Sequence, residues 1–238
     1  ISLISREWSK KITLELIKKQ NNTYKLNFIY LTKDIKFKHD NFSNFKHIEP
    51  KELENEFESI KSLKPDLILA YGWSYIFPKK LTSLYKILIL HPSRLPEYRG
   101  GSPIQNQIIN GVKKSAVTIL LANNKIDSGP IIYQKDLTLS GELNYIFKKI
   151  IYIGLNATIF LIDQIKNNSL KLTIQEDIKA TYYKRRLPKQ SEIMSKDFEK
   201  YEAEYFYNKI RCLQKPYPRP FIKCKNNTKI FLEKVSLK

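Results

Sequence analysis

The chain has 238 residues, of which 42% are hydrophobic and 12% aromatic. This composition is typical of a protein with a globular core and excludes a disordered or fibrous chain. The apolar runs, such as 150–155 and 86–90, are too short to cross a bilayer, and the first residues do not resemble a secretory signal. We therefore expect a cytoplasmic protein without a membrane segment, built as one domain or as one domain with a small appendage.

The formal net charge of +19 raises the question of a nucleic-acid partner, because lysines that bind phosphates release counterions. Only seven of the 42 basic residues are arginines, and the lysines are spread along the chain. We expect a solvated lysine-rich surface, and a nucleic-acid-binding module is the weakest alternative. The cysteines, Cys212 and Cys224, have no metal-binding spacing, so we expect free thiols and no metal site.

Apolar strands alternate with amphipathic helices over most of the chain. The patterns predict strands over 1–5, 25–31, 67–70, 86–90, 116–121 and 130–134. They predict helices over 10–19, 50–63, 104–110 and 141–167, and a loop over 34–45. This alternation indicates an α/β fold, with a Rossmann-like, mostly parallel sheet and helices on both faces. The region after about residue 170 differs in character, so we predict a catalytic domain over 1–172 and a small α+β subdomain over 173–238.

Two polar loops stand out after apolar strands. His91 directly follows the strand 86–90 and opens a stiff segment with three prolines and two adjacent glycines, His91–Pro103. Asp127 lies in the polar loop 122–130, after the strand 116–121. Ligands sit at the carboxyl ends of parallel strands, and neighbouring parallel strands present the same end, so Asp127 is expected near His91. The alternative is that His91 ends a strand and Asp127 forms an ordinary Asx-turn.

These loops resemble the folate-dependent formyltransferases. That family shares a His-Pro-Ser-x-Leu-Pro-x-Tyr-x-Gly segment and, after an apolar strand, an Asp-x-Gly-Pro-Ile turn. The corresponding sequences here are HPSRLPEYRGGSPIQNQIING and AVTILLANNKIDSGPIIYQ. The resemblance is specific from about residue 67 to 134 and looser elsewhere.

The resemblance implies that an amine attacks the formyl group of 10-formyltetrahydrofolate. His91 is then expected to assist proton transfer and to stabilise the oxyanion, with Asp127 as its partner. The folate is expected to contact two loops, through Trp73, Ser74, Tyr75, Ile76, Asn123, Asn124 and Lys125.

One position departs from the family pattern. The family usually has Asn two residues before the catalytic His, and here that residue is Ile89, which has no donor for the oxyanion. Either another amide replaces it, with Asn106, Gln105 and Asn123 as candidates, or the chain is a catalytically impaired binder of folate or of a sugar nucleotide. We take Asn106 as the third catalytic candidate.

The C-terminal sequence bears on the acceptor amine. The segments around Arg185-Arg186-Leu187-Pro188 and Pro216-Tyr217-Pro218 resemble nucleotide-sugar N-formyltransferases, which act in surface glycan synthesis. Arg185, Arg186 and Arg211 are candidates for phosphate contacts, or they are solvated or paired with nearby glutamates. The main alternative is a methionyl-tRNA formyltransferase, whose C-terminal barrel is normally about twice as long as the ~50 residues after Pro188.

The remaining substrate candidates follow the first strand and the site segment. They are Arg6, Glu7 and Trp8, where packing competes as the role of Trp8, together with Arg99, Gly100, Gly101 and Ser102. The apolar residues of the C-terminal region are expected to form either a homodimer surface or core.

Overall fold

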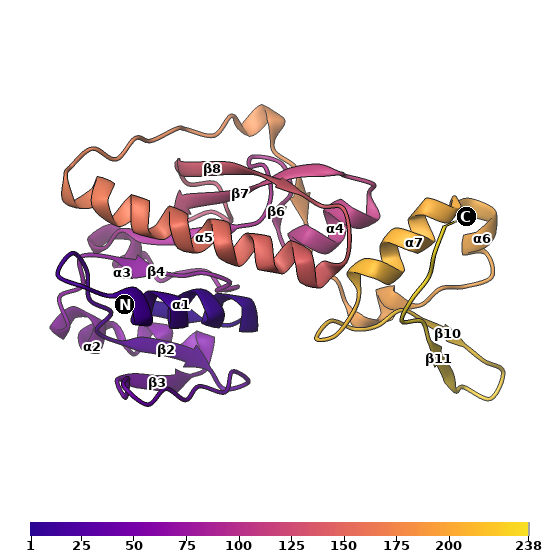
Figure 1. The fold of residues 1–238 in the computed structure, drawn as a ribbon, viewed down its shortest axis with the longest axis horizontal. Helices are drawn as coiled ribbons and strands as arrows, with labels where there is room; N and C mark the ends of the chain where they lie inside the picture. The colour runs from indigo at the N-terminus through magenta and orange to yellow at the C-terminus, as the bar shows by residue number, and fades with distance from the viewer. Residues whose placement is uncertain (238) are drawn as a thin grey trace.

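A seven-stranded sheet organises the protein, and the computed structural model describes residues 1–237. The strands follow the spatial order β3-β2-β1-β4-β5-β7-β8. Their bounds are β1 Ser2–Ile4, β2 Ile29–Thr32, β3 Phe45–Ile48, β4 Ile68–Leu69, β5 Ile87–His91, β7 Lys114–Leu121 and β8 Ile131–Thr138. The first five strands are parallel, while β7 is antiparallel to β5 and β8 is antiparallel to β7. The mostly parallel Rossmann-like sheet expected from the sequence is confirmed (Figure 1).

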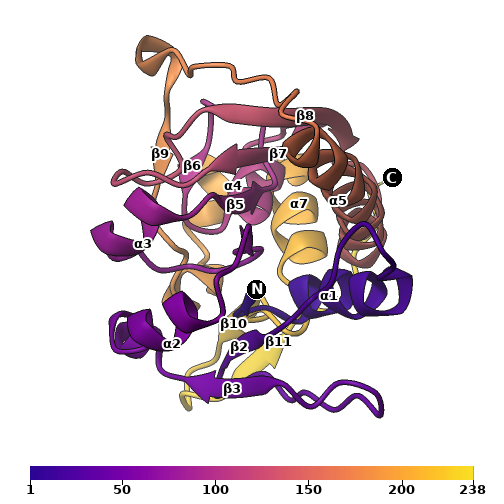
Figure 2. The same cartoon turned by 90° about the vertical axis from the view of Figure 1, so that its left-hand side faces the viewer.

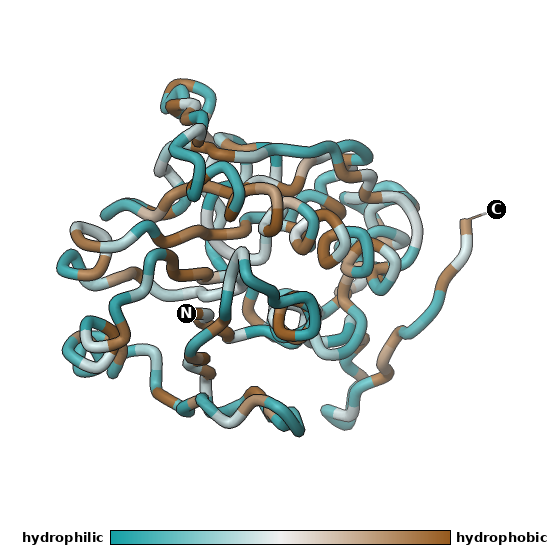
Figure 3. Tube along the Cα trace, turned by 60° about the vertical axis from the view of Figure 1, so that its left-hand side comes forward, coloured by the Kyte–Doolittle hydropathy of each residue, from teal (hydrophilic) through white to brown (hydrophobic). Residues whose placement is uncertain are grey.

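Helices cover both faces of this sheet. On one face, α1 (Glu7–Lys19) and α5 (Leu143–Lys166) bury apolar residues against the sheet. On the other face, the 3₁₀ helix η1 (Pro50–Glu54), α2 (Phe57–Ser62) and α3 (Lys79–Leu84) do the same. Figure 2 shows the two groups on opposite sides. The central strands β1 and β4 are therefore buried along their whole length, as is typical of a sheet covered on both faces, and Figure 3 shows the hydrophobic segments running through the middle of the molecule.

Helix α5 corrects one expectation about the apolar runs. It has 24 residues and is long and apolar enough to cross a membrane. The sequence analysis considered only uninterrupted apolar runs such as 150–155, which are too short. In the structure it packs along α1 and β8, and residues such as Ile146, Ile150 and Leu161 are completely buried in the core. This is the geometry of a core helix.

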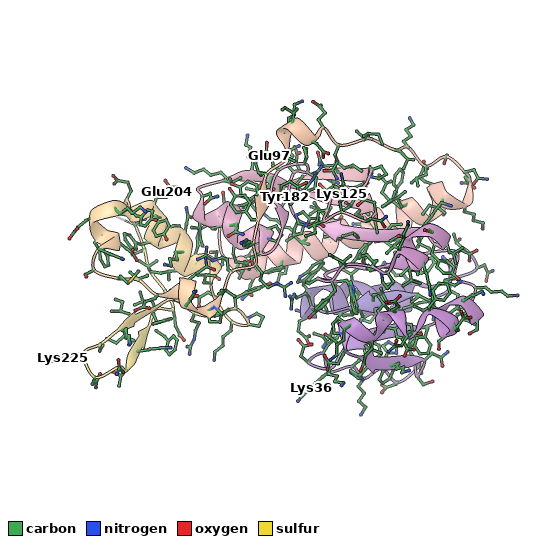
Figure 4. All side chains as sticks on the ribbon, turned by 180° about the vertical axis from the view of Figure 1, so that it is seen from behind. Lys36, Glu97, Lys125, Tyr182, Glu204 and Lys225 are labelled. Carbon is green, nitrogen blue, oxygen red and sulfur yellow. The ribbon has the colours of Figure 1, made fainter. Side chains whose placement is uncertain are left out.

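The last third of the chain first returns over the sheet and then forms a separate small unit. We call residues Thr173–Arg186 the strap. It contains the 3₁₀ helix η2 (Asp177–Lys179) and β9 (Tyr182–Tyr183), which pairs with β6 (Arg99–Gly100). The small unit comprises η3 (Pro188–Ser191), α6 (Asp197–Lys200), α7 (Ala203–Cys212), β10 (Phe221–Lys223) and β11 (Lys229–Phe231). Helix α7 packs on α4 (Pro103–Ile109), and the hairpin carrying Lys225 projects away from the sheet (Figure 4).

The observed elements differ from the sequence patterns in four main respects. Strand β3, on the edge of the sheet, was not predicted: it begins at the last residue of the expected loop 34–45 and continues to Ile48. The predicted helix 50–63 is divided into η1 and α2, and α3 was not predicted. The antiparallel direction of β7 and β8 was also not predicted, and it changes how the candidate site is assembled.

Candidate active site

His91 is the last residue of β5, and its side chain is almost completely buried. Its Nε2 lies 2.8 Å from the carbonyl oxygen of Tyr98. Because a carbonyl only accepts, this contact requires the proton on Nε2. The other ring nitrogen, Nδ1, lies 3.4 Å from Oδ2 of Asp127. The ring is therefore held between a backbone carbonyl acceptor and a carboxylate.

Asp127 reaches His91 by a route that the sequence pattern does not indicate. Strand β7 runs antiparallel to β5, so its end, Leu121, pairs with Leu88 at the beginning of β5. The loop after β7 must turn back along β5 to bring Asp127 to His91, and Asp127 adopts a left-handed φ of 47° there. Its Oδ2 also accepts a hydrogen bond of 2.8 Å from the Gly100 N–H. The predicted proximity is correct, and the reason given for it was wrong.

The rest of this loop is organised by its own side chains. Oδ1 of Asn123 accepts hydrogen bonds from the Lys125 N–H and the Ser128 hydroxyl, at 3.0 and 3.1 Å. Oδ1 of Asn124 accepts from Thr82 at 3.3 Å. Asn123, Asn124 and Lys125 are all exposed at the surface, which leaves the loop open to a ligand.

The second loop expected to contact folate follows β4 and contains Trp73–Ile76. Trp73 is buried in the core under α3, with its ring 5.7 Å from that of Tyr75. Within the described chain its indole Nε1 is buried without a hydrogen-bond partner. Ser74, Tyr75 and Ile76 are exposed, with Ile76 71% accessible. Exposed apolar and aromatic side chains beside an unpaired donor suit a flat heteroaromatic ligand.

The residues after β1 have different environments. Arg6 donates to the Ser74 hydroxyl at 3.2 Å, so its guanidinium lies beside the loop just described. Glu7 is exposed and pairs with Lys10. Trp8 stacks on Phe147 at 6.4 Å, and Phe147 stacks on Tyr217 at 6.0 Å. The structure thus gives Trp8 a packing role.

Arg99 requires a correction. We expected it to contact substrate, but its side chain is completely buried. Its guanidinium donates to Gln175, Asp177 and Tyr182, with distances between 2.6 and 3.1 Å. A buried charge that is fully paired within the protein stabilises structure and has no donor directed at a ligand.

The adjacent glycines also differ from expectation. They were expected to let the backbone approach a substrate, but they let it approach the strap. A Cβ on Gly100 would lie 2.4 Å from the Tyr183 carbonyl oxygen, and one on Gly101 would lie 2.3 Å from the Arg185 nitrogen. Ser102 adopts a left-handed φ of 51° at the start of α4, and its hydroxyl accepts from the Arg186 N–H. These residues join the strap to the site segment.

Asn106, proposed to replace the missing family Asn, is buried in α4, and its amide nitrogen donates to the Gly101 carbonyl at 2.9 Å. One of its two N–H groups therefore braces the turn before α4. Ile89 packs partly buried against the cluster beneath α3. By contrast, the amide nitrogen of Gln105 is buried and has no partner in hydrogen-bond geometry among residues 1–237. The Tyr217 hydroxyl is its polar neighbour, because the Gln105 side chain lowers the pKa of Tyr217, although the two groups do not meet in hydrogen-bond geometry.

A basic cluster adjoins Gln105. We call Arg6, Arg185 and Tyr217 the basic rim. Burial, and then the charge of Arg6, lower the pKa of Arg185. Burial raises the pKa of Tyr217, while Gln105, Arg6 and Arg185 oppose that rise. Two guanidinium groups that repel each other beside a donor-rich surface form an arrangement suited to an anion.

Arg186 and Arg211, the other two candidates for phosphate contacts, donate hydrogen bonds within the protein. Arg186 donates to the Gln190 carbonyl at 3.0 Å and is partly buried. Arg211 donates to the carbonyls of Leu139 and Gly141, at 2.9 and 2.7 Å, and to Asn208. The idea that Arg211 contacts a phosphate is therefore wrong, because it fastens α7 to the turn before α5.

The sequence analysis missed Gln175. This strap residue is 9% exposed, and its amide bonds to Arg99 on one side and to the Asp127 loop on the other. Its only sequence signal is its place between apolar and acidic residues past the predicted domain boundary, and that pattern is not diagnostic. The described residues contain no group of three or more His, Cys, Asp or Glu side chains placed to hold a metal ion.

Comparisons with known proteins identify the family. Residues 6–143 match the family model described as formyl transferase. Methionyl-tRNA formyltransferases from Thermotoga maritima and Bacillus velezensis are 31% and 34% identical to the chain, over 74% and 70% of its residues. These matches cover 57% and 52% of those relatives, so the chain spans about half the length of the curated relatives that it matches.

Solved structures share the fold over nearly the whole chain. A methionyl-tRNA formyltransferase from Clostridium thermocellum aligns with a TM-score of 0.71 and 29% identity, covering 97% of this chain and 96% of that one. A 4-N formyltransferase from Francisella tularensis aligns with a TM-score of 0.75 and 20% identity, covering 98% of both chains. With the family model matching more than half of the residues, the protein belongs to the formyl transferase family.

Proposed function

We propose that the protein transfers a formyl group from 10-formyltetrahydrofolate to the primary amine of a nucleotide-linked amino sugar. The observation that carries the formyl-transfer step is the pair formed by His91 and Asp127, 3.4 Å apart at the carboxyl end of β5. The family assignment supports the donor, and the loops at Trp73–Ile76 and Asn123–Lys125 have the exposure and the unpaired donor that a pterin requires. We expect the reaction to take place in the cytoplasm.

The chemistry needs one proton to be moved. The donor supplies an electrophilic formyl carbon; the amine nitrogen bonds to it, the bond to N10 of the folate breaks, the amine loses a proton and N10 gains one. His91 carries its proton on Nε2 and directs Nδ1 at the Asp127 carboxylate. In this proposal the pair accepts the amine proton, holds it as an imidazolium beside a carboxylate, and returns it to N10. The imidazolium also stabilises the negative charge that develops on the formyl oxygen.

Ile89 leaves that oxygen without the amide donor typical of the family. The Gln105 amide nitrogen is one of the buried donors of the described chain that have no partner in hydrogen-bond geometry. We propose it as the replacement, in place of Asn106, whose amide is already bound to Gly101. A site that lost its donor without replacement is expected to be slower by about a hundredfold or more, which is the impaired-binder alternative.

The acceptor assignment depends on the basic rim. A nucleotide-linked sugar carries a pyrophosphate, and guanidinium groups bind phosphate oxygens in a fork geometry. Arg6 and Arg185 both lower the pKa of Tyr217, so the three groups lie near one another, and Arg6 borders the Trp73–Ile76 loop through its hydrogen bond to Ser74. This location suits a diphosphate whose amino sugar extends towards His91.

Methionyl-tRNA is the second candidate acceptor. The relatives from Thermotoga maritima and Bacillus velezensis are methionyl-tRNA formyltransferases, and the net charge of +19 would favour a polyanion. The same basic rim would then bind a phosphate of the tRNA acceptor end.

A transfer assay separates these possibilities. The protein is incubated with 10-formyltetrahydrofolate and, in turn, dTDP-, UDP- and GDP-linked amino sugars and methionyl-tRNA, and product mass is followed with release of tetrahydrofolate. We expect turnover with one sugar nucleotide and a loss of about 10³-fold or more in His91→Ala. Turnover with methionyl-tRNA alone would assign the second acceptor, and folate binding without turnover would identify the impaired binder.

A further inference from the structure

The amide of Gln175 lies between the loop that carries Asp127 and the guanidinium of Arg99. Its Oε1 accepts hydrogen bonds from Nε and Nη2 of Arg99, at 3.1 and 2.9 Å. Its Nε2 donates to the carbonyls of Asp127 and Gly129, at 2.9 and 2.7 Å. Each of the two polar atoms of the buried Gln175 side chain therefore takes part in two hydrogen bonds.

The orientation of this amide follows from its partners. A guanidinium only donates, and a carbonyl only accepts. The oxygen of Gln175 must therefore face Arg99, and the NH₂ group must face the loop. The completely buried Arg99 charge holds this orientation, because turning the amide would set donor against donor.

The loop is held from two sides as a result. Gln175 binds the main-chain carbonyl of Asp127, and the Gly100 N–H binds its carboxylate at 2.8 Å. Gly100 directly follows Arg99 in the chain, so the contacts close a ring through Arg99, Gln175 and Asp127. Asp127 needs this support because its left-handed φ of 47° is unfavourable for a residue with a Cβ.

From this ring we infer that Gln175 is a positioning residue that holds Asp127 against His91. The strap is then part of the catalytic unit, although it lies outside the residues matched by the family model. The inference rests on the proposed function in so far as Asp127 acts in the reaction. Gln175 itself bonds to the loop and to Arg99 and takes no part in the chemistry.

Two variants separate positioning from folding. Gln175→Glu keeps an oxygen for Arg99, and adds charge pairing with it, but removes both N–H donors to the loop. Gln175→Leu removes all four contacts. We expect kcat for the acceptor that the wild-type protein uses to fall about 10- to 100-fold in Gln175→Glu, with KM changed less than about threefold.

Asp177→Asn is the matched control. Asp177 also pairs with Arg99, at 2.8 Å, but it makes no contact with the Asp127 loop and its side chain is 71% exposed. We expect kcat within about threefold of the wild type. An equal loss in Asp177→Asn and Gln175→Glu would overturn the inference, because the effect would then come from disturbing Arg99.

A double-mutant cycle tests whether Gln175 acts through Asp127. In an Asp127→Asn background, Gln175→Glu should lower kcat by less than about twofold further, since the positioned carboxylate is already absent. If the decreases in kcat of the two single variants multiply in the double variant, Gln175 does not act through Asp127 and has a general structural role.

A spectroscopic measurement does not depend on turnover. The chain has three histidines, so ¹⁵N ring resonances of labelled protein can be assigned to His91 with His91→Ala. We expect the His91 shifts in Gln175→Glu to move to those of Asp127→Asn, and to stay at wild-type values in Asp177→Asn. Unchanged shifts in Gln175→Glu would overturn the inference. If the wild-type protein formylates no acceptor while the shifts move as expected, the proposed function fails and the positioning role stands.

Discussion

At the scale of single residues, Arg185 is the most direct test of the acceptor site. Its guanidinium has a lowered pKa, caused first by burial and then by the charge of Arg6. A bound phosphate would relieve that repulsion, so Arg185→Gln should raise KM for a phosphate-bearing acceptor about tenfold with little change in kcat. The measurement is a steady-state titration of the acceptor at two salt concentrations.

Arg219→Gln provides the matched control for Arg185. Arg219 pairs with Glu233 and lies over the Phe231 ring in the β10–β11 hairpin. Removing its charge lowers the net charge equally but leaves the basic rim intact, so KM should stay within about twofold of the wild type. Equal effects of the two substitutions would mean that the total charge, and not the basic rim, attracts the acceptor.

The residues of the site were predictable where local sequence determines their place. His91 and Asp127 follow apolar strands, and the motifs around them predicted that the two side chains lie close together, as they do. Arg99 and Gln175 could not be predicted, because their roles depend on each other across 76 positions of the sequence. Burial of Arg99 requires partners from the strap, and no pattern near Arg99 shows that those partners exist.

At the scale of elements, the turn between β7 and β8 depends on Gly129. A Cβ at this position would lie 1.8 Å from the Leu121 carbonyl oxygen, a backbone atom that no side-chain rotation can move. Gly129→Ala should therefore cost about 3 kcal/mol and lower Tm by about 6–12 °C. It should also reduce kcat, because the displaced turn carries Asp127 with it.

Gly141→Ala serves as the comparison for Gly129→Ala. Gly141 has a φ of 87°, but a Cβ there meets no atom within 4 Å. The substitution introduces only backbone strain of about 1–2 kcal/mol, and kcat should be unchanged. Thermal unfolding monitored by circular dichroism, with the transfer assay, distinguishes the two variants. A Gly129→Ala protein as stable and active as the wild type would show that the turn can open without cost.

The direction of β7 shows the limit of sequence patterns for elements. Its apolar run has six fully buried residues in succession and would look the same in a parallel or an antiparallel strand. The hairpin with β8 fixes only the relative direction of β7 and β8, so the direction of β7 against β5 is seen only in the structure. Strand β3 was missed for a different reason, since its exposed Lys46 and His47 at a sheet edge look like loop.

At the scale of the whole molecule, the strap connects the two domains predicted from the sequence, 1–172 and 173–238. The predicted boundary at 172/173 falls just before Thr173, whose backbone pairs with Ile131 of β8. From there the chain supplies Gln175 to the site and then pairs through β9 with β6. The boundary remains a prediction, and these contacts favour moving it beyond the strap, because backbone pairing ties Thr173–Arg186 to the catalytic sheet.

Packing of the small C-terminal unit against α4 can be followed through Cys212. This thiol lies on α7 within 4.0 Å of the Gln105 carbonyl and is completely inaccessible. Burial raises its pKa to about 12, so at pH 8 only about one part in 10⁴ is thiolate, the form that reacts with disulfide reagents. Cys224 is partly exposed in the hairpin.

We expect one fast-reacting thiol in the native protein at pH 8 and two in denaturant, with Cys224→Ser removing the fast phase. Rapid reaction of both thiols in the native protein would mean that α7 separates from α4 readily, and the basic rim, which needs Tyr217 from this unit, would then be assembled only part of the time.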